Sequence, residues 1–267
     1  MPRCASDRIA PVRFLRKVRG GSQSALIEAS DGLEYVVKWQ QSPQGCHVAL
    51  NESFGTDLYR EIGLPTPQWA AIEISDNFID AHPDMWFRVG NRHLRPAAGL
   101  HFASLRLGTV TQTVYEVLPG SWFTRIQNRN SFLGALAADV WSEHVDCRQA
   151  LFLQDEGHRF LSAVYIDHGH MFGGPDGSQK TRLRACMHLD LRVYDGLGAD
   201  DDLDYWISRI EDQGETIIAN AAASIPEEWR SSRIEKNVDH LWTNLPKLRD
   251  LLMPAVFQFR AATAVAS

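Results

Sequence analysis

The chain has 267 residues, of which 44% are hydrophobic and 22% are charged, and its formal net charge at pH 7 is -6. These values are typical of a globular protein with one large domain or two closely packed lobes, and they exclude disordered, collagen-like and disulfide-rich classes. The acidic balance argues against direct nucleic-acid or membrane binding, and no stretch approaches the roughly 18 apolar residues of a membrane-spanning helix. The cysteines have no metal-binding spacing, so we predict a cytoplasmic protein with reduced thiols. They are Cys4, Cys46, Cys147 and Cys186.

The first part of the chain has the pattern of β-strands. Residues 12–18 form an apolar and basic run, which is followed by Gly20-Gly21-Ser22. Two β-type runs come next, at residues 25–27 and 35–39. Asp31-Gly32 between them is a hairpin signal. The pattern therefore predicts a glycine turn, a strand, a tight turn and a second strand.

One helix interrupts this β-rich region. From about residue 46 to residue 62 the apolar residues have helical spacing, and Gly63 and Pro65 are expected to end the helix. Further strands are predicted at residues 69–74 and 86–89.

We place a boundary between two lobes near Leu118, which gives an N-lobe over residues 1–118 and a C-lobe over residues 119–267. Residues 90–113, just before it, are weakly patterned. After it, residues 132–141 have helical periodicity, with Asn130 or Ser131 as the N-cap. The other elements expected in the C-lobe are β runs at 151–153 and 160–166 joined at 155–157, a loop at 173–177, and helices at 203–210, 216–223 and 234–252.

Five features occur in the order that phosphoryl transfer from ATP requires. ATP phosphates need backbone N–H groups, a lysine and carboxylates that hold a metal ion. Gly20-Gly21-Ser22 offers the backbone groups, Lys38 ends a strand, and Glu52 on the next helix is placed to pair with it. Asp146 lies in a loop, and Asp167 forms an Asp-X-Gly sequence directly after an apolar strand, where a carboxylate suits Mg²⁺. Each feature is weak alone, and the common order is the signal.

Two alternatives remain open on the residues themselves. Glu61 lies on the same helix as Glu52 and competes for the lysine. The run Asp167-His168-Gly169-His170, with His144 or His158 as a third ligand, also suits Zn²⁺ or Fe²⁺ and would indicate a metal-dependent hydrolase.

Several short motifs between residues 18 and 174 carry a family resemblance. They are Arg19-Gly20-Gly21-Ser22-Gln23, Val36-Val37-Lys38, Asn51-Glu52, Gly63-Leu64-Pro65-Thr66-Pro67, Leu100-His101-Phe102, Asp139-Val140-Trp141, Asp146-Cys147-Arg148-Gln149-Ala150 and Ile166-Asp167-His168-Gly169. With these motifs the sequence resembles the HipA-like kinases, atypical relatives of the Ser/Thr protein kinases.

The resemblance implies an α+β, protein-kinase-like fold, with a β-rich N-lobe containing one helix, a mainly helical C-lobe, and ATP and Mg²⁺ in the cleft. Gly20, Gly21, Ser22 and Gln23 would then form the phosphate loop. Residues 114–118, including Glu116 and Val117, would form the hinge that contacts adenine.

The resemblance also assigns catalytic roles by position. Lys38 would hold the α- and β-phosphates, and Glu52 would brace it. Asp146 would be the catalytic aspartate, and Asp167 the main Mg²⁺ ligand. Gln149 would occupy the metal-binding amide position, although it follows Asp146 more closely than the usual asparagine does. No activation segment is evident after Asp167.

We therefore predict an ATP- and Mg²⁺-dependent Ser/Thr protein kinase of the HipA-like type, with a protein substrate. An antitoxin-like regulator is a further partner that the resemblance suggests. HipA toxins carry an N-terminal subdomain that we do not expect in this chain. A nucleotide-binding pseudokinase and a small-molecule kinase are the alternatives that share the same cleft.

Overall fold

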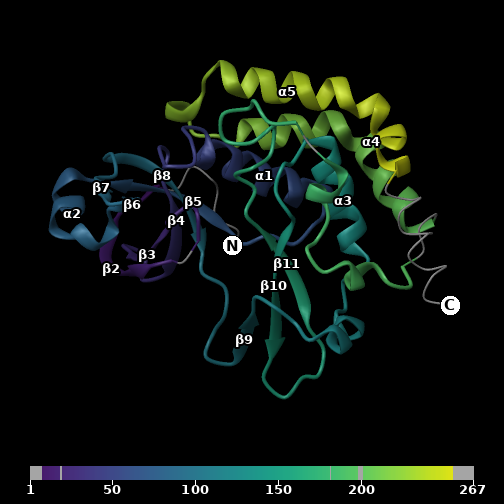
Figure 1. The fold of residues 1–267 in the computed structure, drawn as a ribbon, viewed down its shortest axis with the longest axis horizontal. Helices are drawn as coiled ribbons and strands as arrows, with labels where there is room; N and C mark the ends of the chain where they lie inside the picture. The colour runs from purple at the N-terminus through teal and green to yellow at the C-terminus, as the bar shows by residue number, and fades with distance from the viewer. Residues whose placement is uncertain (1–7, 19, 181, 198–200, 255–267) are drawn as a thin grey trace.

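The computed structural model describes residues 8–18, 20–180, 182–197 and 201–254. Cys4 and Arg19 therefore lie outside the described residues. Figure 1 shows a β-sheet lobe with its strands at the left and a lobe of long helices at the upper right. This arrangement confirms the predicted α+β fold with a β-rich N-lobe and a helical C-lobe.

The N-lobe is built on a curled six-stranded sheet in the order β1-β5-β8-β4-β3-β2. β1 is parallel to β5, and all other neighbours are antiparallel. The strands are β1 (Arg8–Ile9), β2 (Pro11–Lys17), β3 (Ala25–Ala29), β4 (Glu34–Lys38), β5 (Trp69–Ile74) and β8 (Gly99–Leu105).

β8 lies at the centre of this sheet, although its sequence did not predict a strand. Ala103 pairs with Val37 of β4 on one side and with Ala70 of β5 on the other. The strand contains Gly99 and Ala103, which have weak β propensity, and no β-branched residue. Its position is therefore fixed by two strand partners rather than by its own residues.

The N-lobe contains an insertion between β5 and β8. α2 (Asp76–Ala81) is followed by a two-stranded ribbon of β6 (Phe87–Val89) and β7 (Arg92–Leu94). Ser75 caps α2 by accepting a hydrogen bond from the backbone N–H of Phe78. The prediction of a single N-lobe helix missed α2, because six residues are too few to show helical periodicity.

α1 (Val48–Ile62) lies between the two lobes and is buried along most of its length. It begins two residues later than predicted, and it ends at Gly63, whose left-handed φ of 94° favours glycine. One face of α1 packs against β8, and other faces contact the C-lobe helices. The main hydrophobic core consequently runs from α1 into the C-lobe.

The C-lobe combines a small sheet with several helices. The sheet has the order β11-β10-β9 and is antiparallel throughout. β9 precedes Leu118 yet pairs with β10, so the chain joins the C-lobe sheet before the predicted boundary. The elements are β9 (Gln112–Tyr115), α3 (Ser131–Trp141), β10 (Gln149–Asp155), β11 (Ser162–Ile166), α4 (Asp201–Ala223) and α5 (Ser232–Asn244).

Three C-lobe predictions differ from the structure. The helix predicted at residues 234–252 is interrupted, because α5 ends at Asn244 and a 3-10 turn follows at Leu245–Lys247. The helices predicted at residues 203–210 and 216–223 form one continuous helix, α4. Gly214, in the middle of α4, lets Leu245 pack closely against the helix, because a Cβ there would lie 2.7 Å from Cδ2 of Leu245. Asn130 precedes α3 but makes no side-chain cap, and its Oδ1 instead accepts a hydrogen bond from Trp206 Nε1 (2.6 Å).

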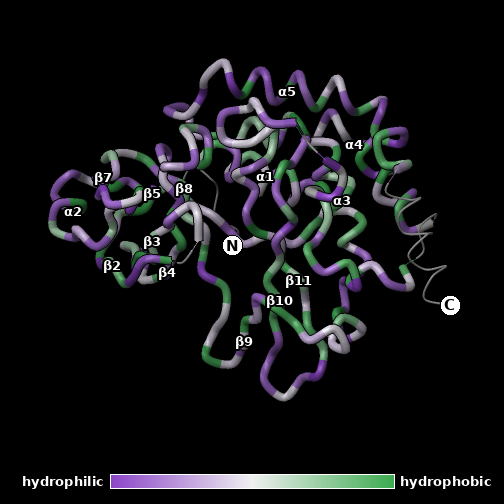
Figure 2. The backbone as a smooth tube through the Cα atoms, viewed as in Figure 1, coloured by the Kyte–Doolittle hydropathy of each residue, from purple (hydrophilic) through white to green (hydrophobic). Residues whose placement is uncertain are grey.

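α5 covers the outside of the C-lobe, where its trace is largely hydrophilic in Figure 2. Only Asn237 and Leu241 of this helix are buried. Among the described residues, no helix combines the length and apolar character needed to cross a membrane.

Candidate active site

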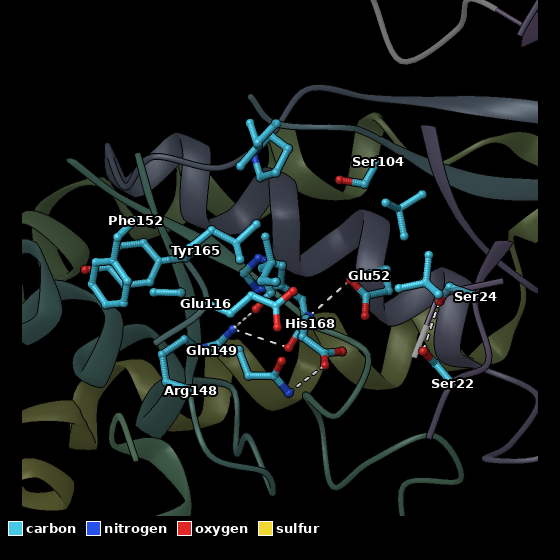
Figure 3. A pocket seen from close by; sticks show the side chains of 18 of the residues that line it. Ser22, Ser24, Glu52, Ser104, Glu116, Arg148, Gln149, Phe152, Tyr165 and His168 are labelled. Carbon is cyan, nitrogen blue, oxygen red and sulfur yellow. Dashed lines mark hydrogen bonds between the residues drawn. The ribbon is translucent and has the colours of Figure 1, made fainter. Parts of the chain in front are cut away.

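A cavity of about 860 Å³ opens between the two lobes. Residues of β4, α1 and β8 line it from the N-lobe, and residues of β10 and β11 line it from the C-lobe. In Figure 3, Ser22 and Ser24 lie on one side of Glu52, and Arg148 and Gln149 lie on the other. The fold therefore brings Ser22 of the predicted phosphate turn and the predicted metal-binding residues Asp167 and Gln149 to one cavity.

Lys38 is paired with two carboxylates at the centre of this cavity. Its ammonium group forms ion pairs with Glu52 and with Asp167, where the distance from Nζ to Oδ1 is 2.8 Å. The Lys38 side chain is 11% exposed and that of Glu52 is 2% exposed. Glu61, the competing glutamate, instead accepts a hydrogen bond from Asn220 on the surface (2.7 Å).

The charges in this group determine its protonation. Burial alone would lower the pKa of Lys38, but the carboxylates of Asp167 and Glu52 raise it above the usual value. Burial opposes ionisation of Asp167, yet the adjacent lysine holds the pKa of this carboxyl well below its usual range. Lys38 is therefore a cation and Asp167 an anion at neutral pH, as binding of phosphate and metal requires.

Glu52 also holds the turn that presents Asp167. Its Oε2 accepts a hydrogen bond from the backbone N–H of His168 (3.1 Å), and its Oε1 accepts one from that of Gly169 (2.7 Å). Asp167 itself has a φ of 66°, in the left-handed region. A Cβ at Gly169 would lie 2.8 Å from Glu52 Oε1, which explains the glycine of the Asp-X-Gly sequence.

Asn51 fixes the next stretch of the same loop. Its Nδ2 lies 3.1 Å from the carbonyl oxygens of Gly169 and Met171, and 3.4 Å from that of Gly174. The side chain is fully buried. Neighbouring residues of α1 thus hold both the Asp167 turn and the loop after it, a role for Asn51 that its place in the Asn-Glu motif did not specify.

The β10–β11 hairpin places Gln149 beside Asp167. Gln149 pairs with Ile166 in the register of the two strands, and its Nε2 donates a hydrogen bond to Asp167 Oδ2 (2.8 Å). Both carboxylate oxygens of Asp167 therefore face protein donors. A carboxylate and an amide oxygen are ligands that suit Mg²⁺, so the donor set fits this ion once the Gln149 amide presents its oxygen.

Asp146, the predicted catalytic aspartate, is exposed and is not among the described residues that line the cavity. Its Oδ1 accepts a hydrogen bond from the backbone N–H of Cys147 (2.8 Å), and Cys147 lines the cavity. The ring of His144 connects this loop to the Asp167 turn, with Nδ1 2.6 Å from the carbonyl oxygen of Asp146 and Nε2 3.3 Å from that of Asp167. Burial lowers the pKa of His144 to about 4, so the ring is neutral at pH 7.

A buried ion pair between Arg148 and Asp139 lies next to the Asp167 turn. Arg148 donates from Nε to Asp139 Oδ2 (2.7 Å) and from Nη2 to Asp139 Oδ1 (2.6 Å). Both side chains are 0% exposed. Nη1 of Arg148 also donates to the carbonyl oxygens of Ile166 (2.8 Å) and Asp167 (3.3 Å). The sequence contained these two residues within motifs, but gave no sign that they pair.

The predicted nucleotide-binding residues are only partly gathered at the cavity. Ser22, Glu116 and Val117 line it, whereas Gly20, Gly21 and Gln23 are not among the described residues that do. The side-chain amide of Gln23 instead forms two hydrogen bonds with the backbone of Arg88, on β6 (2.7 and 2.8 Å). Residues 104–107, which end β8 and follow it, also line the cavity and were not predicted.

The alternative transition-metal site does not form. His168 points into the core, where its ring lies 4.5 Å from that of Tyr59 and is 1% exposed. Across the residues that the structure describes, no group of three or more His, Cys, Asp or Glu side chains is placed to hold a metal ion.

No model of a known protein family matches this sequence, and a search of curated proteins found no matching sequence. Solved structures do match. The crystal structure of the Golgi casein kinase has a TM-score of 0.59 and 10% identity, and the match covers 94% of this chain and 73% of that one. The same kinase with Mn and ADP bound has a TM-score of 0.53 and 10% identity, and the match covers 94% of this chain and 73% of that one. The proinflammatory kinase CtkA of Helicobacter pylori has a TM-score of 0.50 and 13% identity, and the match covers 93% of this chain and 96% of that one. The chain therefore has a kinase-like fold.

Proposed function

We propose that this protein is an ATP-dependent phosphotransferase that phosphorylates a Ser or Thr hydroxyl of a protein. The observation that carries the proposal is the buried Lys38, paired with both Glu52 and Asp167 inside a cavity between two kinase-like lobes. The HipA-like type and an antitoxin-like regulator remain part of the proposal through the sequence resemblance alone.

The side chains at the cavity divide the work of phosphoryl transfer, which is mainly positioning and charge stabilisation. Lys38 holds the phosphates of ATP, and Glu52 keeps the lysine oriented. Asp167 and the amide oxygen of Gln149 would hold Mg²⁺, which neutralises phosphate charge when bound. A manganese ion and ADP are bound in one of the structurally similar kinases.

Asp146 serves the acceptor. The acceptor hydroxyl oxygen forms a bond to the γ-phosphorus, and the bond between this phosphorus and the oxygen of ADP breaks. The hydroxyl proton passes to the Asp146 carboxylate, which is exposed and whose Oδ1 accepts a hydrogen bond from the adjacent N–H of Cys147. The products are a phosphoester and ADP.

A catalytically weak, nucleotide-binding pseudokinase is the second candidate. The observation that favours it is the hydrogen bond from Gln149 Nε2 to Asp167 Oδ2 (2.8 Å), which occupies a metal-binding oxygen with a protein donor. In that case ATP would bind without turnover.

A thermal-shift titration with ATP, with and without Mg²⁺, tests the proposal. A ligand at 100 times its dissociation constant stabilises the folded state by about 2.7 kcal/mol. We expect a Mg²⁺-dependent shift in the wild type and in Asp239→Asn, an exposed carboxylate on α5, but not in Asp167→Asn. ADP release in the presence of a protein acceptor then separates the kinase from the pseudokinase. No shift at millimolar ATP would overturn both.

A further inference from the structure

The segment that follows the Asp167 turn is basic, in a chain whose net charge is -6. Residues 177–189 contain Lys180, Arg182 and Arg184 and no acidic residue. All three basic side chains are exposed. Such a run is either a solvated stretch of loop or a site for negative charge, and its position in the fold decides between them.

This segment returns to the catalytic loop. The backbone N–H of Arg148 donates to the carbonyl oxygen of Met187 (3.1 Å), and Sγ of Cys186 lies 3.4 Å from the carbonyl oxygen of His144. Residues 188–191 then line the same cavity as Cys147 and Gln149. The end of the basic segment therefore adjoins the cavity wall, next to the loop that carries Asp146.

Arg184 is held at this rim by the backbone of the cavity wall itself. Its Nη1 donates to the carbonyl oxygen of His188 (3.1 Å), and its Nη2 donates to that of Leu189 (2.8 Å). Within the described parts of the chain, Lys180, Arg182 and Arg184 form no ion pair, whereas the nearby Arg192 is neutralised by Asp190 (2.6 Å). Arg184 thus lies against the cavity wall, and Lys180 and Arg182 precede it in the same exposed segment, with no ion pair to any described residue.

Exposed apolar side chains occupy the same rim. Leu189 is 72% exposed and Leu191 is 43% exposed, and both line the cavity mouth. A rim with both cationic and apolar side chains suits a polypeptide, which offers carboxylates and apolar side chains along one extended stretch. A small charged metabolite would leave the two leucines uncovered.

We propose that Lys180, Arg182 and Arg184 bind an acidic protein segment, so that the acceptor Ser or Thr is one flanked by Asp or Glu. This inference rests on the proposed function, because the acceptor site is defined by the transfer reaction. The carboxylates of the segment pair with the three cations, and its hydroxyl lies at Asp146. Because the cations are exposed, salt should weaken the interaction, with a screening length of about 8 Å at 0.15 M ionic strength.

The test uses peptides with a central Ser or Thr whose flanking residues are Asp and Glu, their isosteres Asn and Gln, or Lys and Arg. Binding to the full chain is measured by fluorescence anisotropy with ADP and Mg²⁺, and phosphorylation is measured with ATP. The variant is Lys180→Glu with Arg184→Glu, and the control is Lys236→Glu, an exposed lysine on α5.

We expect the wild type and the Lys236→Glu control to favour the acidic peptides over the amide isosteres by about tenfold at low salt, from several exposed charge pairs. The double variant should lose this preference and favour the basic peptides, while its ATP-induced thermal shift is unchanged. A gain of binding to basic peptides cannot result from misfolding.

The outcomes separate the two proposals. If acidic peptides bind with this charge dependence but no peptide is phosphorylated, the surface is correct and the kinase activity is wrong. If peptides are phosphorylated with equal kcat/KM whether their flanks are acidic or neutral, or if only a small molecule is phosphorylated, the acidic acceptor is wrong. Absence of any charge-dependent binding also overturns it.

Discussion

Replacement of Arg148 by methionine should destabilise this protein strongly and disturb the turn that carries Asp167. The guanidinium is buried, makes two hydrogen bonds to Asp139, and donates to the carbonyl oxygens of Ile166 and Asp167. Removing one member of a buried ion pair leaves the other charge uncompensated, which costs about 3–5 kcal/mol. For a chain of this size, that loss corresponds to a fall in Tm of about 6–15 °C.

A double-mutant cycle measures whether the pair itself is responsible. Asp139→Asn with Arg148→Met removes both charges and keeps an amide oxygen for the hydroxyl of Tyr59, which donates to Asp139 Oδ1 (2.7 Å). We expect this double variant to be more stable than Arg148→Met alone by about 1–3 kcal/mol. Urea unfolding of the four proteins gives the coupling free energy.

Arg192→Met is the matched control, because Arg192 forms a similar ion pair with Asp190 but its side chain is 60% exposed. It should cost about 1 kcal/mol or less. The reasoning is refuted if Arg148→Met unfolds within 1 kcal/mol of the wild type, or if the effects of Asp139→Asn and Arg148→Met simply add.

Three further predictions concern α1 and the buried histidines. Glu52→Gln removes the negative charge beside the buried lysine, so ATP should bind roughly 10-fold to 100-fold more weakly by calorimetry; an unchanged affinity would contradict the bracing role. Gly55→Ala should lower the free energy of unfolding in urea by about 1–3 kcal/mol, because the alanine Cβ would lie 2.5 Å from the Cβ of His168. An unchanged free energy of unfolding would show that the turn at His168 can shift without loss of stability. Burial lowers the pKa of His101 and of His144 from 6.5 to about 4. As the pH falls, these histidines are therefore protonated in the unfolded chain before they are protonated in the folded one. The free energy of unfolding should consequently fall as the pH drops from about 6.5 to 4. Each histidine should contribute about 3 kcal/mol to the loss in unfolding free energy, and His101→Gln should remove the contribution of His101. If the free energy of unfolding of this variant depends on pH as in the wild type, His101 does not cause the loss.

The sequence predicted those parts of the fold whose signals are local. The β3–β4 hairpin follows from Asp31-Gly32, where Gly32 has a φ of 78° and Asp31 Oδ1 accepts a hydrogen bond from the N–H of Leu33 (3.0 Å). β8 could not be predicted, because its place depends on two strands that are distant in sequence. Two helices were predicted at residues 203–210 and 216–223, whereas α4 continues through Gly214, where the missing side chain gives Leu245 room to pack.

The candidate site also contains residues that local sequence signals predicted and contacts that they did not. Lys38 at a strand end and Asp167 after a buried strand carry their signals in neighbouring residues, and the structure places both at the cavity. The contact of Gln149 with Asp167 depends on the register of the β10–β11 hairpin, which residue patterns do not specify. The diversion of Gln23 to Arg88 depends on the inserted β6–β7 ribbon, whose second strand was not predicted.

α1 joins the two halves of the site into one mechanical unit. Glu52 contacts Lys38 of the N-lobe and the backbone of the Asp167 turn, and Asn51 holds the loop beyond that turn. A displacement of α1 would therefore separate Lys38 from Glu52 and release the Asp167 turn at the same time. Because both contacts depend on one helix, a shift of α1 would disturb the lysine pair and the turn together, rather than either alone.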